Sequence, residues 1–165
     1  PHAAIGRLFN VEKGTVQSSK RDDGEYAFIT AADDWLTHSE YTHECEALIF
    51  VFGAGGSLGK VHYTNNRKFV VSDLCFILTP KNPQSINLKF YYAYFNSHRK
   101  EIVQRLARGT NKKSINETRF IEYLVAFPSK EEQDRIGSEV DRIFDNIESF
   151  KQKIAEEQHK LEHLV

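Results

Sequence analysis

The chain has 165 residues, and its 22 Lys and Arg nearly balance its 23 Asp and Glu, for a formal net charge of −1 at pH 7. Apolar residues make up 40% and charged residues 27%, which argues against a disordered or a fibrous chain. The longest apolar run, residues 47–52, is far shorter than the roughly 20 residues that span a bilayer. With no signal-peptide pattern at the start, we expect a cytoplasmic protein without a membrane segment.

Charge is distributed unevenly along the chain. Residues 22–46 carry eight acidic residues and neither Lys nor Arg, whereas residues 60–119 carry twelve basic residues and three acidic ones. Residues 128–165 are acidic again, with six basic residues and ten acidic ones. Because phosphate affinity depends on local clusters of Lys and Arg, the middle segment can form a polyanion-binding face. A solvated surface with scattered charge explains the same composition equally well.

Up to Pro128, short β-rich runs alternate with turn signals. Four strands are expected, at residues 25–30, 47–52, 60–64 and 68–79. A helix is predicted over 88–107, where apolar residues recur at spacings of three and four and Asn87 is suited to cap the first turn. A polar loop over 108–116 and a short strand over 123–127 follow. The predicted fold class is α+β, a small irregular mixed sheet with flanking helices.

After Pro128 the pattern becomes that of one long helix. Ser129 and Glu132 form a capping box at its start. The residues of one helix face are then spaced alternately four and three apart, and eight of these nine are apolar: Ile136, Val140, Ile143, Ile147, Phe150, Ile154, Glu157, Leu161 and Leu164. A period of 3.5 residues predicts a coiled-coil seam against a partner helix. An amphipathic helix lying on its own domain is the alternative. We therefore expect two parts, residues 1–127 and a helical segment 128–165.

The glycine-rich segment 53–60 does not match a nucleotide-binding motif. A Walker A loop would need Gly at Ala54 and Ser or Thr at Val61, and the dinucleotide fingerprint would need Gly at Leu58. Both motifs open a helix, whereas this segment leads into a predicted strand. It is expected to be a wide hairpin loop, or a stretch of backbone that approaches a ligand closely with Lys60 available to a phosphate.

The sequence nominates neither a catalytic constellation nor a metal site. His38, His43 and Cys45 are close in sequence, but spacing of this kind is common by chance. Cys45 and Cys75 are expected to be reduced thiols. A nucleophile elbow and a glycine signature for S-adenosylmethionine are both missing. These residues do not exclude an enzyme but nominate none, and a hydrolase of unrecognised site remains an alternative. We expect no metal and no cofactor to be bound by this chain itself.

Three loops carry Lys, Ser, Thr, Asn and Gln side chains suited to phosphates and base edges. The residues expected to bind nucleic acid are Lys13, Thr15, Gln17, Ser18, Ser19, Lys20, Gly55, Gly56, Ser57, Lys60, Thr110, Asn111, Lys112, Lys113 and Ser114. Each loop alone is consistent with a solvated surface. Together in one small domain they favour recognition of a polyanion.

Five motifs, covering essentially the whole chain, resemble one half of the DNA-specificity subunit of type I restriction-modification systems. They are Ile5-Gly6-Arg7-Leu8-Phe9 leading to Lys13-Gly14, Tyr26-x-Phe28-Ile29-Thr30, the Gly53 to Val61 loop, Gly109-Thr110-x-x-x-Ser114-Ile115, and Phe127-Pro128-x-x-x-Glu132-Gln133-x-Arg135-Ile136. The last is the most specific, since it opens the long helix. The resemblance implies a target recognition domain followed by one conserved spacer helix.

The resemblance also implies a function. Such a subunit is not catalytic; it recognises a bipartite sequence in double-stranded DNA through two recognition domains held apart by paired antiparallel helices. Its implied partners are a methyltransferase subunit that modifies adenine with S-adenosylmethionine, and a restriction subunit that translocates and cuts DNA with ATP and magnesium.

This chain has only one recognition domain and one spacer helix. It is therefore expected to be a half-subunit that dimerises through its seam or pairs with a second recognition unit, or else a fragment of a longer chain. That longer chain could be a single-chain methyltransferase-endonuclease. A protein-interaction module with a coiled-coil helix is the competing reading.

Overall fold

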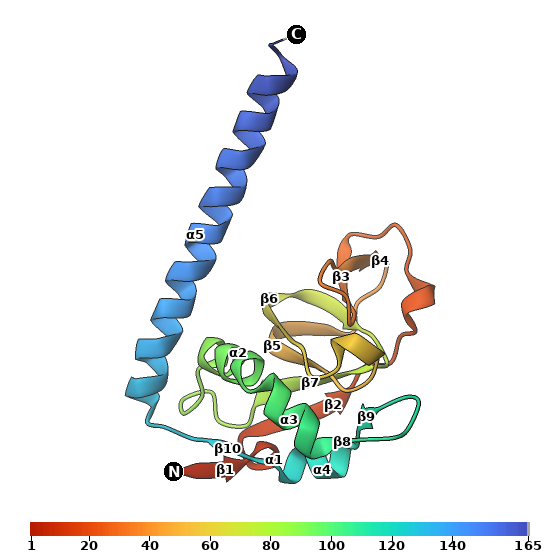
Figure 1. Ribbon diagram of the computed structural model, residues 1–165, viewed down its shortest axis with the longest axis vertical. Helices are drawn as coiled ribbons and strands as arrows, with labels where there is room; N and C mark the ends of the chain where they lie inside the picture. The colour runs from red at the N-terminus through yellow and green to blue at the C-terminus, as the bar shows by residue number, and fades with distance from the viewer. Residues whose placement is uncertain (165) are drawn as a thin grey trace.

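A six-stranded mixed sheet organises the first part of the chain, and one long helix projects from it, in a computed structural model that describes residues 1–164 (Figure 1). The strands run in the order β2-β7-β5-β6-β3-β4. Their bounds are β2 (Phe9–Lys13), β3 (Tyr26–Ile29), β4 (Leu36–His38), β5 (His43–Val51), β6 (Val61–Val71) and β7 (Cys75–Pro80). Neighbours are antiparallel except β3 and β6, which are parallel. The α+β class expected from the sequence is confirmed.

The central strand β5 divides its side chains between two cores, because successive side chains of a strand point to opposite faces. Leu48 and Phe50 pack with β7 and the helices on one face, whereas Ala47, Ile49 and Val51 pack with residues of β3, β6 and β7 on the other. All five are at most 1% exposed. Such burial on both faces explains the continuous apolar run that marked this strand in the sequence.

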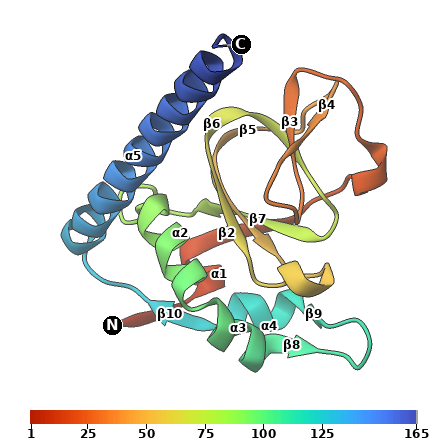
Figure 2. The same cartoon turned by 45° about the horizontal axis from the view of Figure 1, so that its top comes forward.

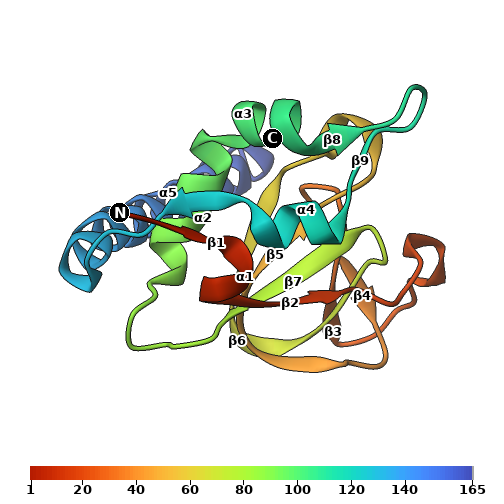
Figure 3. The same ribbon diagram turned by 90° about the horizontal axis from the view of Figure 1, so that it is seen from below.

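Shorter elements surround the sheet. The helices are α1 (Ile5–Leu8), α2 (Leu88–Ser97), α3 (Arg99–Leu106), α4 (Glu117–Glu122) and α5 (Lys130–Glu162), with 3-10 turns η1 (Ser18–Lys20) and η2 (Gly55–Ser57). Two small ribbons pair β1 (His2–Ala4) with β10 (Leu124–Ala126) and β8 (Ala107–Arg108) with β9 (Ser114–Ile115). Seen from below, β1 and α1 lie beside β10 and α4 (Figure 3). No helix within residues 1–164 is long and apolar enough to cross a membrane.

Two predicted elements are each divided in the structure. The expected strand 68–79 is the end of β6 and all of β7 but its last residue, separated by a turn in which the Ser72 hydroxyl accepts the Leu74 N–H at 3.2 Å. The expected helix 88–107 breaks at His98 into α2 and α3. At His98 the backbone has φ −102° and ψ 10°, which departs from helical geometry, although the His98 N–H still donates to the Tyr94 carbonyl at 3.0 Å.

Several short elements were not predicted. The segment 108–116, expected as a loop, holds β9 and the end of β8, and α4 follows it with Asn116 accepting the Arg119 N–H as a cap. β1, α1, β2 and β4 were also missed because runs of three to five residues carry too little periodicity. The expected strands at 25–30, 47–52 and 123–127 are confirmed, whereas the one expected at 60–64 is the first part of β6, which continues to Val71. Cys45 and Cys75 are free within residues 1–164, and Cys75 is buried in β7.

A buried amide joins α5 to the sheet domain. Gln133 is 0% exposed; its Nε2 donates to the carbonyls of Ser85 and Pro128 at 3.0 and 2.9 Å, and its Oε1 accepts the Asn87 N–H at 2.8 Å. The Asn87 side chain caps α2 and also donates to Asp134 at 3.0 Å. This bond and an ion pair with Lys130 hold the pKa of Asp134 below its usual range. The start of α5 is thereby fixed to the start of α2.

Close packing and a second set of contacts extend this junction. A Cβ on Gly137 would lie 2.6 Å from Asn87 Nδ2, so only glycine allows the helices to approach this closely. Further along, Phe144 packs against Tyr63 and Tyr92 at ring-centroid distances of 6.2 and 5.4 Å, and Lys89 pairs with Asp141. The first part of α5 therefore lies on its own domain.

The rest of α5 extends away from the domain (Figure 1). Its 33 residues span about 50 Å. Of the predicted seam, Ile136 is half-buried and Val140 is buried against the domain. The apolar residues that remain exposed are Ile143, Ile147, Phe150, Ile154, Leu161 and Leu164. The surface open to a partner helix thus begins at Ile143, and Val165, the last residue of the predicted segment, lies outside the described residues.

Replacing Gln133 should destabilise the junction. Gln133→Ala leaves the Asn87 N–H and two carbonyls without partners in a dry contact, so we expect the free energy of unfolding to fall by about 2–4 kcal/mol. Urea denaturation of the full chain measures it. The matched control is Gln152→Ala, on the exposed part of the same helix, which should change stability by less than about 0.5 kcal/mol. Equal midpoints for the two variants would contradict the role given to Gln133.

Candidate nucleic-acid interface

The three predicted loops lie on the side of the sheet domain that faces away from α5 (Figure 2). Phe52 connects them. The Lys13 ammonium lies 5.2 Å from the centroid of the Phe52 ring, and the Phe52 carbonyl accepts the Ile115 N–H at 2.9 Å. The β2 end, the β5–β6 loop and the β8–β9 hairpin therefore meet at one edge of the domain.

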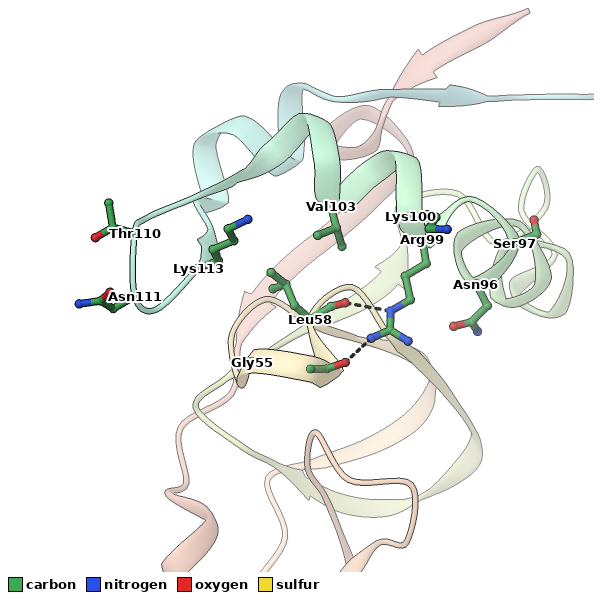
Figure 4. Close-up of a pocket in the computed structure, with 11 residues that line it drawn as sticks. Gly55, Leu58, Asn96, Ser97, Arg99, Lys100, Val103, Thr110, Asn111 and Lys113 are labelled. Atoms are coloured by element: carbon green, nitrogen blue, oxygen red, sulfur yellow. Dashed lines mark hydrogen bonds between the residues drawn. The ribbon is translucent and has the colours of Figure 1, made fainter.

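Two of the loops form the walls of a cleft of about 680 Å³ (Figure 4). The β5–β6 loop contributes one wall, the tip of the β8–β9 hairpin a second, and the α2–α3 corner the floor. The lining residues are Gly55, Gly56, Leu58, Asn96, Ser97, Arg99, Lys100, Val103, Thr110, Asn111 and Lys113. Three of these residues are cationic, and none of this set, drawn from the described residues, is acidic. An open, positively charged cleft with amide and hydroxyl groups is suited to a polyanion.

Arg99 holds the glycine-rich loop against α3. Its Nε donates to the Leu58 carbonyl at 2.9 Å and its Nη2 to the Gly56 carbonyl at 2.7 Å (Figure 4). Gly59 has φ +83°, and a Cβ there would lie 2.5 Å from Val103 Cγ2. The glycine and the guanidinium together let the loop sit directly on the helix. The sequence predicted a loop here but gave no partner for it.

Asn96 and Lys100 also belong to the site and were missed. The Asn96 side chain bonds both backbone groups of Val61, accepting from the N–H at 3.1 Å and donating to the carbonyl at 3.0 Å, which joins α2 to the start of β6. Lys100 is exposed at the start of α3. The sequence placed both residues inside one unbroken helix. The only signal for the site was the adjacent pair Arg99-Lys100 within the basic stretch.

The first predicted loop lies beside the cleft and does not line it. Thr15 N–H donates to the Val71 carbonyl at 3.2 Å, and the Ser18 hydroxyl lies 3.5 Å from that of Ser72, so the loop follows the β6–β7 turn. The six predicted residues of this loop are all exposed: Lys13, Thr15, Gln17, Ser18, Ser19 and Lys20. Their exposure leaves them available to a duplex that crosses this edge.

Lys60 is held by an acidic residue. Its ammonium lies 2.7 Å from Asp33, and the lysine side chain is only 22% exposed. The hydrogen bond and charge of Lys60 hold the pKa of the Asp33 carboxyl below its usual range. Lys60, Ser57, Lys112 and Ser114 are not among the residues that line the cleft, whereas Gly55, Gly56, Thr110, Asn111 and Lys113 are.

A buried histidine lies close to this ion pair. His62 is 9% exposed, and burial lowers its pKa, while its Nε2 has no hydrogen-bond partner within residues 1–164. Its ring meets Trp35 edge-on at 6.0 Å, and Arg67 lies 5.7 Å from the Trp35 ring centroid. No group of three or more His, Cys, Asp or Glu is gathered for a metal in the described part of the chain.

Comparisons with known proteins agree on one family. Residues 3–157 match the family model described as type I restriction modification DNA specificity domain. The type I restriction enzyme EcoDI specificity subunit of Escherichia coli is 24% identical over 151 residues, which cover 91% of this chain and 32% of that protein. The chain thus spans about a third of the length of this curated relative.

Solved structures share the fold. The type I restriction-modification S subunit from M. genitalium superposes with a TM-score of 0.80 at 20% identity, over 96% of this chain and 42% of that one. The HsdS subunit from Thermoanaerobacter tengcongensis gives a TM-score of 0.61 at 16% identity, over 93% and 39%. At these identities the likeness shows the fold, including a long helix after an α+β domain.

Proposed function

Because the chain belongs to the family of type I restriction modification DNA specificity domains, we propose that it recognises a DNA sequence as the non-catalytic target recognition part of a specificity subunit. The observation that carries this proposal is the cleft between the β5–β6 loop and the β8–β9 hairpin, where Arg99, Lys100 and Lys113 gather without an acidic lining residue. The chain would act where the DNA is, which we expect to be the cytoplasm.

The exposed side chains around the cleft divide into two roles. Lys13, Lys20 and Lys112 would contact phosphates, which position a protein on the duplex and carry no sequence information. Gln17 and Asn111 offer a donor and an acceptor in one amide, the pairing that reads adenine in the major groove.

The exposed seam of α5 would bind a second helix. We propose that it pairs antiparallel with the spacer helix of a second recognition unit, either in a longer chain or in a second copy of this one. The coverage of 32% to 43% of the related chains supports a unit that is one of two halves. The assembled subunit would direct a methyltransferase subunit, which uses S-adenosylmethionine, and a restriction subunit, which uses ATP and magnesium. A fragment of a single-chain methyltransferase-endonuclease would use the same recognition surface.

The function is tested by methylation in the assembled complex. The full chain is purified with the methyltransferase subunit encoded beside it, and the complex is incubated with a random DNA library and S-adenosylmethionine. We expect methylated adenines within a fixed bipartite motif, because two recognition units held by paired helices read two half-sites. A palindromic motif would mean two copies of this chain. No complex and no sequence preference would contradict the proposal and favour an interaction module.

The β8–β9 hairpin should contribute to salt-dependent DNA affinity. Lys112→Ala with Lys113→Ala removes two exposed charges, so we expect weaker binding to all sequences and a salt slope smaller by about 2. Fluorescence anisotropy of a labelled duplex over a salt series measures both. The control, Arg7→Ala with Lys151→Ala, removes two charges away from the three loops and should leave the slope unchanged. An unaltered slope in the Lys variant would remove this hairpin from the interface.

The seam should control association. Ile143→Glu with Ile147→Glu places two charges in an apolar contact, so we expect a monomer in sedimentation velocity where the wild-type chain dimerises. Ser149→Glu with Gln152→Glu adds the same charge on the outer face of α5 and should leave the dimer intact. A dimer that survives the first pair of changes would refute the seam.

A further inference from the structure

Gly56 is a glycine for which the fold itself gives no reason. Its backbone φ is not in the left-handed region, unlike that of Gly55 at +53° and Gly59 at +83°. A Cβ built on Gly56 meets no atom within 4 Å, whereas one on Gly59 would collide with Val103. Neither conformation nor internal packing therefore excludes a side chain at position 56. The space that a side chain would occupy borders the cleft.

The loop around Gly56 has backbone N–H groups without acceptors among the described residues, and its carbonyls are largely occupied. Arg99 occupies the carbonyls of Gly56 and Leu58, and the N–H groups of Ser57 and Leu58 donate within the turn to Ala54 and Gly55. Within residues 1–164, the N–H groups of Gly55 and Gly56 have no acceptor. A ligand that approaches this loop meets unpaired N–H groups and a guanidinium, which is a setting for an anion.

Two lysines on the other walls of the cleft also favour an anion. Lys100 comes from α3 and Lys113 from the β8–β9 hairpin, so two ammonium groups border the cleft from separate elements (Figure 4). Both are exposed, and neither has an ion-pair partner among the described residues. The nearby carboxylate of Asp33 is neutralised by Lys60.

We propose that this cleft binds one backbone phosphate of duplex DNA, which comes close enough to the main chain at Gly56 that a side chain there would keep it out. Lys100 and Lys113 supply the charge, and Arg99 is a positioning residue that holds the loop in place. This inference rests on the proposed function and makes it more specific: Gly56, Lys100 and Lys113 anchor the DNA backbone, and the bases are read by other residues of the same edge, such as Gln17 and Asn111.

The test compares Gly56→Val and Lys100→Ala in the full chain assembled with its methyltransferase subunit. Anisotropy is measured with two duplexes, one carrying the methylated motif and one carrying a scrambled motif. We expect Gly56→Val to weaken both at least about threefold, with their affinity ratio unchanged, because a phosphate contact carries no sequence information. Lys100→Ala should weaken both and reduce the salt slope by about 1. Lys153→Ala, on α5, is the matched control and should do neither.

The outcomes separate this inference from the proposed function. If the wild-type complex prefers the motif duplex and both variants bind DNA as tightly as the wild type, only the phosphate site is overturned. A loss restricted to the motif duplex would also overturn it, since that result indicates base reading. Inorganic phosphate could also bind in the cleft at constant ionic strength without weakening the binding of DNA. That result would assign the cleft to free phosphate and overturn the inference too. A wild-type complex without sequence preference would overturn both proposals. Unchanged urea midpoints show that the variants are folded.

Discussion

The buried Gln133 amide fixes the angle at which α5 leaves the sheet domain, and the rest of the arrangement depends on this angle. A buried amide with all its partners satisfied accepts only one geometry, because any rotation of the helix would leave buried donors or acceptors unpaired. Ser85 and Asn87 come from the segment before α2, and Pro128 from the segment before α5. Gly137 adds close packing against Asn87 to these hydrogen bonds. The junction is rigid because hydrogen bonding and packing specify the same arrangement.

This rigidity fixes how two surfaces with different chemistry are placed relative to each other. The basic loops face away from α5, and the apolar seam begins at Ile143, just beyond the domain. The position of a duplex relative to the helix axis then depends on the folded junction and not on a flexible linker.

The sequence predicted what is periodic or chemically distinctive and missed what depends on contacts between distant residues. The long helix, its Ser129 cap and the buried run at 47–52 follow from local patterns, and each is confirmed. The break at His98 is a change of backbone dihedral angles at one residue, which no period reveals. Arg99 was missed because its partners, Gly56 and Leu58, lie more than forty residues away in the chain. The three loops were found by composition, but only the fold shows that two of them form one cleft.

The fold shows what the acidic stretch 22–46 does: one of its carboxylates neutralises a lysine of the basic segment. Its Asp33 pairs with Lys60, so a cation that composition counted as available to phosphate is already neutralised. The remaining free cations of this edge lie where a duplex can meet several of them at once. A protein that must discriminate between sequences gains from this arrangement, because uncommitted positive charge strengthens binding to every sequence equally. In the proposed function, the near-zero net charge would confine attraction to the face that meets the DNA, and the rest of the surface would contribute little non-specific affinity.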